Sequence, residues 1–173
     1  MDPSTAVRHG DWFVLLDPKW SSEAHAGDPP LEVVVGGWRI EKDGELGPFQ
    51  PNPGYLPLSP RSPSDPIDAL LRLADIGEDR SDRIVPTLLR TVVEIACDEQ
   101  HRPRTAMSPD GIRCAVVVTA EIHKQHLGVR HWVPVLGSRL YGALPECTDI
   151  LFNPGGDHSF RLTAAAVRPS DRI

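Results

Sequence analysis

Hydrophobic residues are densest in residues 112–118, IRCAVVV, where apolar side chains occupy both sets of alternating positions. Neither face of such a strand can be left facing water, so the run predicts the central strand of a covered sheet. Its short, β-branched character and the glycine directly before it favour a strand over a buried helix. Residues 108–111, SPDG, predict a tight turn ahead of the strand, because proline fixes φ at the second position and glycine closes the turn.

Two further strand patterns lie in the first part of the chain. Residues 11–16, DWFVLL, form an apolar run bounded by a glycine and by an Asp-Pro pair. Residues 31–35 form a β-branched run that Gly36-Gly37 interrupts, and paired glycines in a strand indicate a bulge or a close backbone approach. Because Asp43-Gly44 is a hairpin signal, we expect a β-hairpin here with Trp38 on its buried face.

Helical periodicity dominates the middle of the chain. Asp65-Pro66 predicts a helix start, with aspartate as N-cap and proline at the first helical position, and Gly77 predicts its end. A second helix is expected from Asp82 or Arg83, because two adjacent apolar stripes at helical spacing continue as far as Ala96. So wide an apolar face predicts that this helix packs closely on the sheet.

Shorter elements follow the central strand. The patterns predict a helical segment at 121–126, a half-buried strand at 129–135, a small amphipathic helix at 136–144, a brief strand at 149–152, a tight turn at 153–156 and a strand or short helix at 159–167. Mixed elements in this order predict an α+β fold in which helices cover one mixed β-sheet. The length of 173 residues fits a single domain over 1–173.

Residues 47–66 are dense in proline, at positions 48, 51, 53, 57, 60, 63 and 66, which predicts a connection without regular structure. A connection this long inside a compact domain is either functional or held on the surface. Its two aromatic residues, Phe49 and Tyr55, favour a segment that packs both rings on the body of the domain. The alternative is a mobile binding loop.

The composition of the chain limits the partners and the cellular location that we expect for the protein. The formal net charge of −6 and the pI of about 5.6 oppose binding to phosphate backbones, so nucleic acid is not expected as a partner. The N-terminus lacks the basic and apolar regions of a secretory signal, and no apolar run of about 18 residues could span a membrane. Three cysteines without CxxC spacing indicate reduced thiols. We therefore expect a cytoplasmic protein that does not insert into membranes.

No catalytic motif is found in the chain. The hydrolase pattern GxSxG and the nucleotide-binding patterns GxxxxGK[ST] and GxGxxG are absent from the sequence. His123 and His126 are three residues apart with His131 close by, but this spacing alone is typical of surface histidines. Cys147, in the least apolar setting of the three cysteines, is interpreted as structural or incidental. We assign no catalytic residue, no metal and no cofactor.

Binding surfaces are the remaining class of site. The turn at 153–156, NPGG, together with Asp157, could form a backbone nest for an anion, although such turns more often only reverse the chain. A tryptophan exposed beside the proline-rich segment would make a docking anchor. The predicted partner-binding surface consists of Trp38, Phe49, Tyr55, Asn153, Gly155 and Gly156.

Several short motifs together resemble a known family. They are GGW at 36–38, FQPNP at 49–53, SDP at 64–66, SPDG at 108–111, Trp132, LP at 144–145, DILFNPGG at 149–156 and SFRL at 159–162. In combination they look like actinobacterial proteins labelled type VII secretion system-associated, over most of residues 12–167. From Gly111 onward the chain is also similar to the SseB N-terminal domain, where a small helix ending in Leu-Pro precedes a short strand and an Asn-Pro-Gly turn. Phe152 and Phe160 stand where Leu and Met are expected, which keeps the apolar character.

The resemblance implies a soluble cytoplasmic accessory protein and offers no catalytic residues to carry over. Our leading hypothesis is a non-enzymatic adaptor that binds a protein partner linked to a secretion or secreted-effector system. One alternative is an immunity (antitoxin-like) protein, because a small acidic domain suits the occlusion of a basic effector site. Another is a small tailoring enzyme that uses Cys147 or the group His123, His126 and His131.

Overall fold

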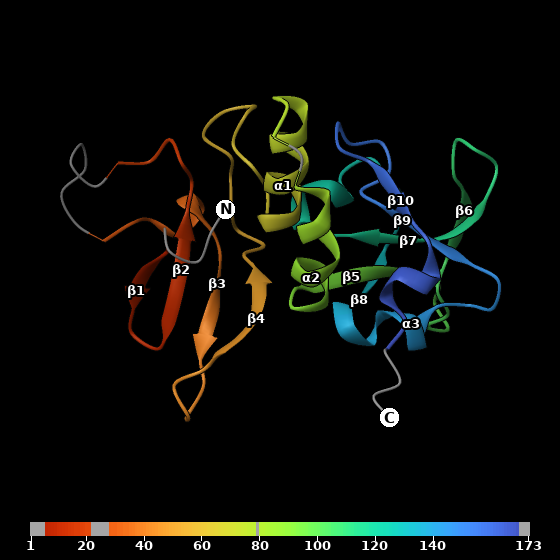
Figure 1. The fold of residues 1–173 in the computed structure, drawn as a ribbon, viewed down its shortest axis with the longest axis horizontal. Coiled ribbons are helices and arrows are strands. Elements are labelled where there is room, and N and C mark those ends of the chain that lie inside the picture. The colour runs from red at the N-terminus through yellow and green to blue at the C-terminus, as the bar shows by residue number, and fades with distance from the viewer. Residues whose placement is uncertain (1–5, 22–27, 79, 170–173) are drawn as a thin grey trace.

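The first half of the chain forms an antiparallel sheet, seen at the left of Figure 1. The computed structural model describes residues 6–21, 28–78 and 80–169. Within them, sheet A has the strand order β1-β2-β3-β4. Its strands are β1 (Val7–His9), β2 (Trp12–Leu16), β3 (Val34–Ile40) and β4 (Leu46–Pro51). The predicted strand at 11–16 and the predicted hairpin around Asp43-Gly44 are therefore confirmed.

The paired glycines of β3 mark a close backbone approach, as predicted. A Cβ atom on Gly36 would lie 2.4 Å from the Gln50 carbonyl oxygen and 2.5 Å from Cζ of Phe49. Trp38 is buried, also as predicted. The prediction of a strand from residue 31 was wrong at its start, because Leu31–Val33 forms a 3-10 turn before β3 begins.

The second half of the chain forms a mixed sheet, sheet B, with the strand order β10-β9-β7-β5-β8. Its strands are β5 (Val92–Cys97), β7 (Arg113–Val118), β8 (His131–Leu136), β9 (Asp149–Phe152) and β10 (Phe160–Leu162), and β6 (Thr105–Met107) pairs with the start of β7. The predicted central strand is confirmed, since β7 lies between β5, to which it is antiparallel, and β9, to which it is parallel. Its side chains from Cys114 to Val118 are all buried.

Helices cover one face of sheet B (Figure 1). They are α1 (Pro66–Asp75), α2 (Ile84–Leu89) and α3 (Leu140–Ala143), with 3-10 turns at Ser81–Arg83, Glu121–Lys124, Gly137–Arg139 and Ala164–Val167. The core beneath them includes Ile67, Leu88, Leu140, Val117 and Phe152. None of the helices in the described part of the chain is long and apolar enough to cross a membrane.

The predicted second helix was wrong in its length. It ends at Leu89, and the residues expected to form its last two turns are strand β5. The threonine at 91 closes the helix, since its hydroxyl donates to the Thr87 carbonyl and its amide to that of Leu88. Beyond it, VVEIAC is rich in β-branched residues and pairs along its whole length with β8, which a helix could not do.

The prediction of one mixed sheet was also wrong, although the α+β class is confirmed. Sheet A packs its own small core, Leu15, Val35, Trp38, Phe49 and Tyr55. The two sheets meet where β4 passes the end of α2: the Phe49 amide donates to the Arg90 carbonyl at 2.8 Å, and Phe49 forms a bridge with Thr91. Strand β4 thus links two layers that each pack their own core.

Replacing Gly36 by alanine should destabilise the protein by about 1–3 kcal/mol, because the added methyl group would overlap the backbone of β4 and the Phe49 ring. Urea unfolding followed by circular dichroism measures the change. The matched control is Gly142→Ala in α3, where a Cβ meets nothing within 4 Å, so stability should be unchanged or slightly higher. Equal effects of the two substitutions would contradict the packing argument.

Candidate functional site

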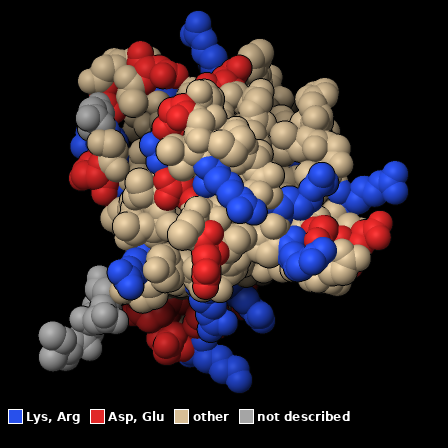
Figure 2. Space-filling view, turned by 90° about the vertical axis from the view of Figure 1, so that its right-hand side faces the viewer, with Lys and Arg blue, Asp and Glu red and all other residues tan. Residues whose placement is uncertain are grey.

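The charged surface shows mixed signs. Figure 2 shows Lys and Arg interspersed with Asp and Glu on the side that lies to the right in Figure 1. Ion pairs account for part of this mixing: Arg161 on β10 lies 2.8 Å from Asp110 and 2.6 Å from Asp149. Because charges of both signs alternate on this side, the grooves of the protein are the better candidates for a binding site.

A groove of about 430 Å³ lies at the carboxyl ends of the parallel strands β7 and β9. We call it the carboxyl-edge groove. Its walls come from the proline-rich segment, α1, the 3-10 turn Glu121–Lys124 and the β9–β10 turn. Its lining includes Pro57, Pro60, Ser64, Asp68, Arg72, Ile122, His123, His126, Leu127, Gly155, Gly156 and His158. Crevices outside the carboxyl ends of parallel strands are where such sheets commonly bind ligands.

The start of α1 fixes one side of this groove. Asp65 is fully buried, and its Oδ1 accepts hydrogen bonds from the amides of Ile67 at 2.7 Å and Asp68 at 3.0 Å. Pro66 occupies the first helical position, so the predicted Asp-Pro helix start is confirmed. Gly77, with φ of 85°, follows the last turn as predicted.

The ends of the two parallel strands are tied to this helix start. Thr119, which follows β7, donates its hydroxyl proton to Asp65 Oδ2 at 2.6 Å. Asn153, which follows β9, donates from Nδ2 to the Thr119 hydroxyl at 2.9 Å and accepts from the Thr119 amide at 3.0 Å. Asn153 is buried and holds the left-handed backbone of its turn, with φ of 47°. These contacts give Asn153 a structural role, and its predicted role in partner binding stays a prediction.

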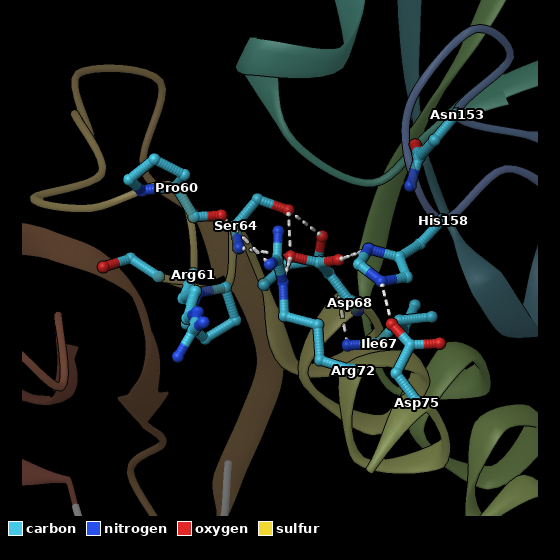
Figure 3. Close-up of polar contacts among 12 residues, drawn as sticks. Pro60, Arg61, Ser64, Ile67, Asp68, Arg72, Asp75, Asn153 and His158 are labelled. Atoms are coloured by element: carbon cyan, nitrogen blue, oxygen red, sulfur yellow. Dashed lines mark hydrogen bonds and ion pairs between the residues drawn. The ribbon is translucent and has the colours of Figure 1, made fainter.

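Asp68 lies at the centre of a second set of contacts, drawn in Figure 3. Its Oδ2 accepts from the Ser64 amide at 2.8 Å and from Arg72 Nε at 2.9 Å. His158 reaches in from the β9–β10 turn, with Nδ1 2.9 Å from Asp68 Oδ1 and Nε2 2.8 Å from Asp75 Oδ2. The contact with Asp68 Oδ1 lacks the direction of a hydrogen bond, so His158 makes its hydrogen bond with Asp75, and its contact with Asp68 is an ion pair only when the ring is protonated.

Ser64 and His123 form the contact in the groove that most resembles a catalytic pair. The Ser64 hydroxyl lies 2.8 Å from His123 Nε2, but also 2.9 Å from Asp65 Oδ2 and 3.3 Å from Asp68 Oδ2. Burial lowers the pKa of His123, against the opposing effect of the two nearby carboxylates, which favours the neutral ring near pH 7. The direction of the contact between Ser64 and His123 depends on the tautomer of the ring. With the proton on Nε2, His123 donates to the Ser64 oxygen, the Ser64 hydroxyl donates to Asp65, and His123 does not act as a base toward Ser64.

The proline-rich segment is held on the body of the protein by the buried carboxylate of Asp17. Asp17 accepts from the Tyr55 hydroxyl at 2.7 Å, the Ser62 hydroxyl at 2.9 Å, and the amides of Leu58 and Lys19 at 2.9 and 2.8 Å. Burial by itself raises the pKa of Asp17, but these hydrogen bonds outweigh it and lower the pKa below the usual range. The interpretation of a packed segment is confirmed, while its first residues, expected to be irregular, belong to β4.

The predicted partner-binding residues do not form one surface. Gly155 and Gly156 are exposed and line the carboxyl-edge groove. Tyr55 is buried on Asp17, and Trp38 and Phe49 are largely buried in the core of sheet A, so all three rings contribute to the packing of the domain. Trp38 and Phe49 also line a different groove, between the two sheets.

The residues of the alternative enzyme hypothesis are likewise scattered. His123 and His126 both line the carboxyl-edge groove, whereas His131 lies on β8 opposite Cys97. Cys147 is exposed between α3 and β9. Across residues 6–21, 28–78 and 80–169, His, Cys, Asp and Glu form no group of three or more that could hold a metal ion.

Sequence reasoning missed Asp17, Ser64, Asp68, Thr119 and His158. For Asp68 a signal was present, because an acid three residues after an N-cap aspartate is the spacing of a capping box, and here it accepts from the Ser64 amide. His158 and Asp17 had no such signal, since their partners lie in distant parts of the chain.

Comparisons with known proteins added no identification. No protein-family model, curated protein or solved structure matches the chain. The resemblance to type VII secretion-associated proteins and to the SseB N-terminal domain therefore remains a prediction.

Replacing Asp17 by asparagine should destabilise the protein by about 1–3 kcal/mol at neutral pH, because four donors lose a buried charged acceptor. The lowered pKa means that this stability is present above the ordinary carboxyl pKa of about 3.9 and is lost as the pH falls through the lower native value. Urea unfolding at a series of acidic pH values should therefore show that the free energy of unfolding of Asp17→Asn falls less steeply with decreasing pH than that of the wild type. The control, Asp11→Asn at an exposed position, should keep the wild-type slope.

Ser64→Ala should lower the free energy of unfolding by about 1–3 kcal/mol, because His123 and the two carboxylates lose a shared buried partner. Thermal and urea unfolding measure the loss. Ser138→Ala, at an exposed position in a 3-10 turn, should change stability by less than about 0.5 kcal/mol. Unchanged stability of Ser64→Ala would contradict a structural role for these hydrogen bonds.

Proposed function

We propose that the protein is a non-enzymatic adaptor that binds a protein partner in the carboxyl-edge groove. One observation carries the proposal: the buried polar groups at and beneath the floor of the groove are engaged mainly with one another. Ser64, Asp65 and Asp68 are almost fully buried and contact His123, Thr119, Arg72 and His158, and Asp68 Oδ1 is the one buried side-chain oxygen of the described residues without a hydrogen bond. A floor whose hydroxyl and carboxylate groups are engaged in this way suits recognition of a surface better than the making or breaking of bonds.

The rims of the groove support a protein partner. Pro57 and Pro60 form one rim, and Ile122 and Leu127 contribute apolar surface opposite them. Leu58, between the two prolines, is 51% exposed. Apolar side chains around a polar centre are usual for surfaces that bind proteins.

The groove is also held in shape before any partner arrives. Asp17 fixes the proline-rich rim, and Asp65 with Thr119 fixes the floor. The exposed glycines Gly155 and Gly156 leave room for a partner backbone to approach the opposite rim. Such preorganisation reduces the ordering that binding would require.

The resemblance described above suggests the setting of this partner, a cytoplasmic component of a secretion or secreted-effector system. An immunity protein is the second candidate, favoured by the net charge of −6, which would complement a basic effector site. The two differ in the partner: a secretion component for the adaptor, and a toxin whose activity is blocked for the immunity protein.

The proposal is tested by capturing the tagged protein from extracts of the organism that encodes it and weighing the complex by native mass spectrometry. We expect one polypeptide at fixed stoichiometry with the wild-type chain. Gln125→Trp, at an exposed position lining the groove, should reduce its capture at least about tenfold, because the indole fills the space of the partner.

The matched control is Gln100→Trp, the same change at an exposed position in the loop between β5 and β6. It should retain the partner. Equal capture by the wild-type and Gln125→Trp proteins would exclude the carboxyl-edge groove as the docking site. A small molecule bound in place of a polypeptide would exclude the adaptor function.

A further inference from the structure

A second groove, of about 340 Å³, lies where the two sheets meet. We call it the inter-sheet groove. Figure 1 shows its setting, with α2 beside β4. Its aromatic floor comes from sheet A, and its other wall comes from the start of α1 and from α2. The residues that carry the argument are Trp38, Phe49, Pro66, Pro86, Arg83 and Arg90.

Trp38, which lines this groove, carries a hydrogen-bond donor on its indole ring. The residue is only 8% exposed, and its ring packs edge-on against Phe49, with centroids 4.9 Å apart and an interplanar angle of 62°. Its indole N–H makes no hydrogen bond within the part of the chain that the structure describes. The indole nitrogen is not among the fully buried polar atoms without a partner, so it keeps some access to solvent and is open to an acceptor supplied by a ligand.

The shape of the groove suits an extended, proline-containing segment. Pro66 and Pro86 line it beside the two aromatic rings. Grooves lined by aromatic side chains bind polyproline II segments, whose backbone carbonyls are free to accept hydrogen bonds from the groove. A ligand could not pair with β4 as an additional strand at Phe49, because the Phe49 amide already donates to the Arg90 carbonyl. A volume near the lower end for ligand pockets fits a short stretch of peptide.

The charged residues on the rim of the groove favour a ligand of negative charge. Arg83 and Arg90 are both exposed, and neither forms a salt bridge within residues 6–21, 28–78 and 80–169. Arg90 donates from Nη2 to the Leu46 carbonyl at 3.0 Å, which holds its guanidinium beside β4. The lining also contains one acidic residue, Asp82. Two arginines and one aspartate give the rim of the groove a net positive charge. In a protein of net charge −6, this local excess favours an acidic ligand.

We infer that the inter-sheet groove binds a short, acidic, proline-containing segment of a partner protein, with a backbone carbonyl of that segment accepting from the Trp38 indole. The prolines of the ligand lie on Trp38 and Pro86, and its carboxylates face Arg83 and Arg90. This site is separate from the carboxyl-edge groove, and different substitutions test the two.

The test titrates a synthetic peptide of repeated Glu-Pro-Pro into the ¹⁵N-labelled protein and follows the tryptophan indole N–H signals by NMR. The Trp38 signal is identified by its absence from the Trp38→Phe spectrum. We expect this signal to shift on binding, while the same peptide with Lys for Glu, or with Ser for Pro, binds at least about tenfold more weakly.

Two substitutions measure separately how the indole N–H and the positive charge contribute to the affinity for the peptide. Trp38→Phe keeps an aromatic ring but removes the N–H, and should weaken the Glu-Pro-Pro peptide about three- to tenfold. Arg83→Glu should weaken it by a similar factor and reduce its dependence on salt. Arg130→Glu, the same change at an exposed position before β8, should leave the affinity unchanged.

The inference is overturned if the Trp38 signal does not move at saturating Glu-Pro-Pro peptide, or if the Lys-Pro-Pro or Glu-Ser-Ser peptide binds as well. It is also overturned if Arg83→Glu and Arg130→Glu bind alike. Should Trp38→Phe fail to fold, the titrations of the wild-type, Arg83→Glu and Arg130→Glu proteins decide the question, with the Trp38 signal assigned by triple-resonance NMR.

Discussion

The buried carboxylate of Asp65 is the interaction on which the arrangement of the second half of the protein depends. It caps α1 through two backbone amides and accepts the hydroxyl of Thr119 at the end of β7. Through Thr119 it is linked to Asn153 at the end of β9. A buried carboxylate is costly unless several donors meet it, so the segments that supply those donors are fixed around it. The carboxyl-edge groove exists because the helix start and the two strand ends are held at one place.

Asp17 has the same role in the first half of the chain. Its four donors come from residues 19, 55, 58 and 62, so one charge orders a segment that proline prevents from forming regular pairing. The two halves then meet through few backbone contacts, chiefly the Phe49 amide on the Arg90 carbonyl. Grooves form along such junctions because each sheet satisfies its own core and neither fills the space between them. Both proposed binding sites lie at junctions of this kind.

The carboxyl-edge groove also shows why residue type alone does not define chemistry. Serine, histidine and aspartate lie within hydrogen-bond distance of one another there. Their use depends on the direction of each hydrogen bond, and the two carboxylates beside Ser64 compete with His123 for the hydrogen bond of its hydroxyl group. The neutral His123 that burial favours completes the same network. Residue types that are common in catalytic sites can thus serve to build a binding surface.

Local sequence determined those features whose physical cause lies within a few residues. The Asp65-Pro66 helix start, the turn before β7, the buried β7 itself and the glycine pair of β3 all follow from backbone geometry or from short-range periodicity. Tertiary structure decided whether residues 92–97 form a helix or a strand, because both periods fit VVEIAC and only the pairing with β8 distinguishes them. It also decided that there are two sheets, that Tyr55 and Asn153 are internal, and that His158 meets Asp68 across about ninety positions of chain. Contacts of that separation leave no periodic trace in a sequence, since the partner of each buried charge is set by the packing of whole elements.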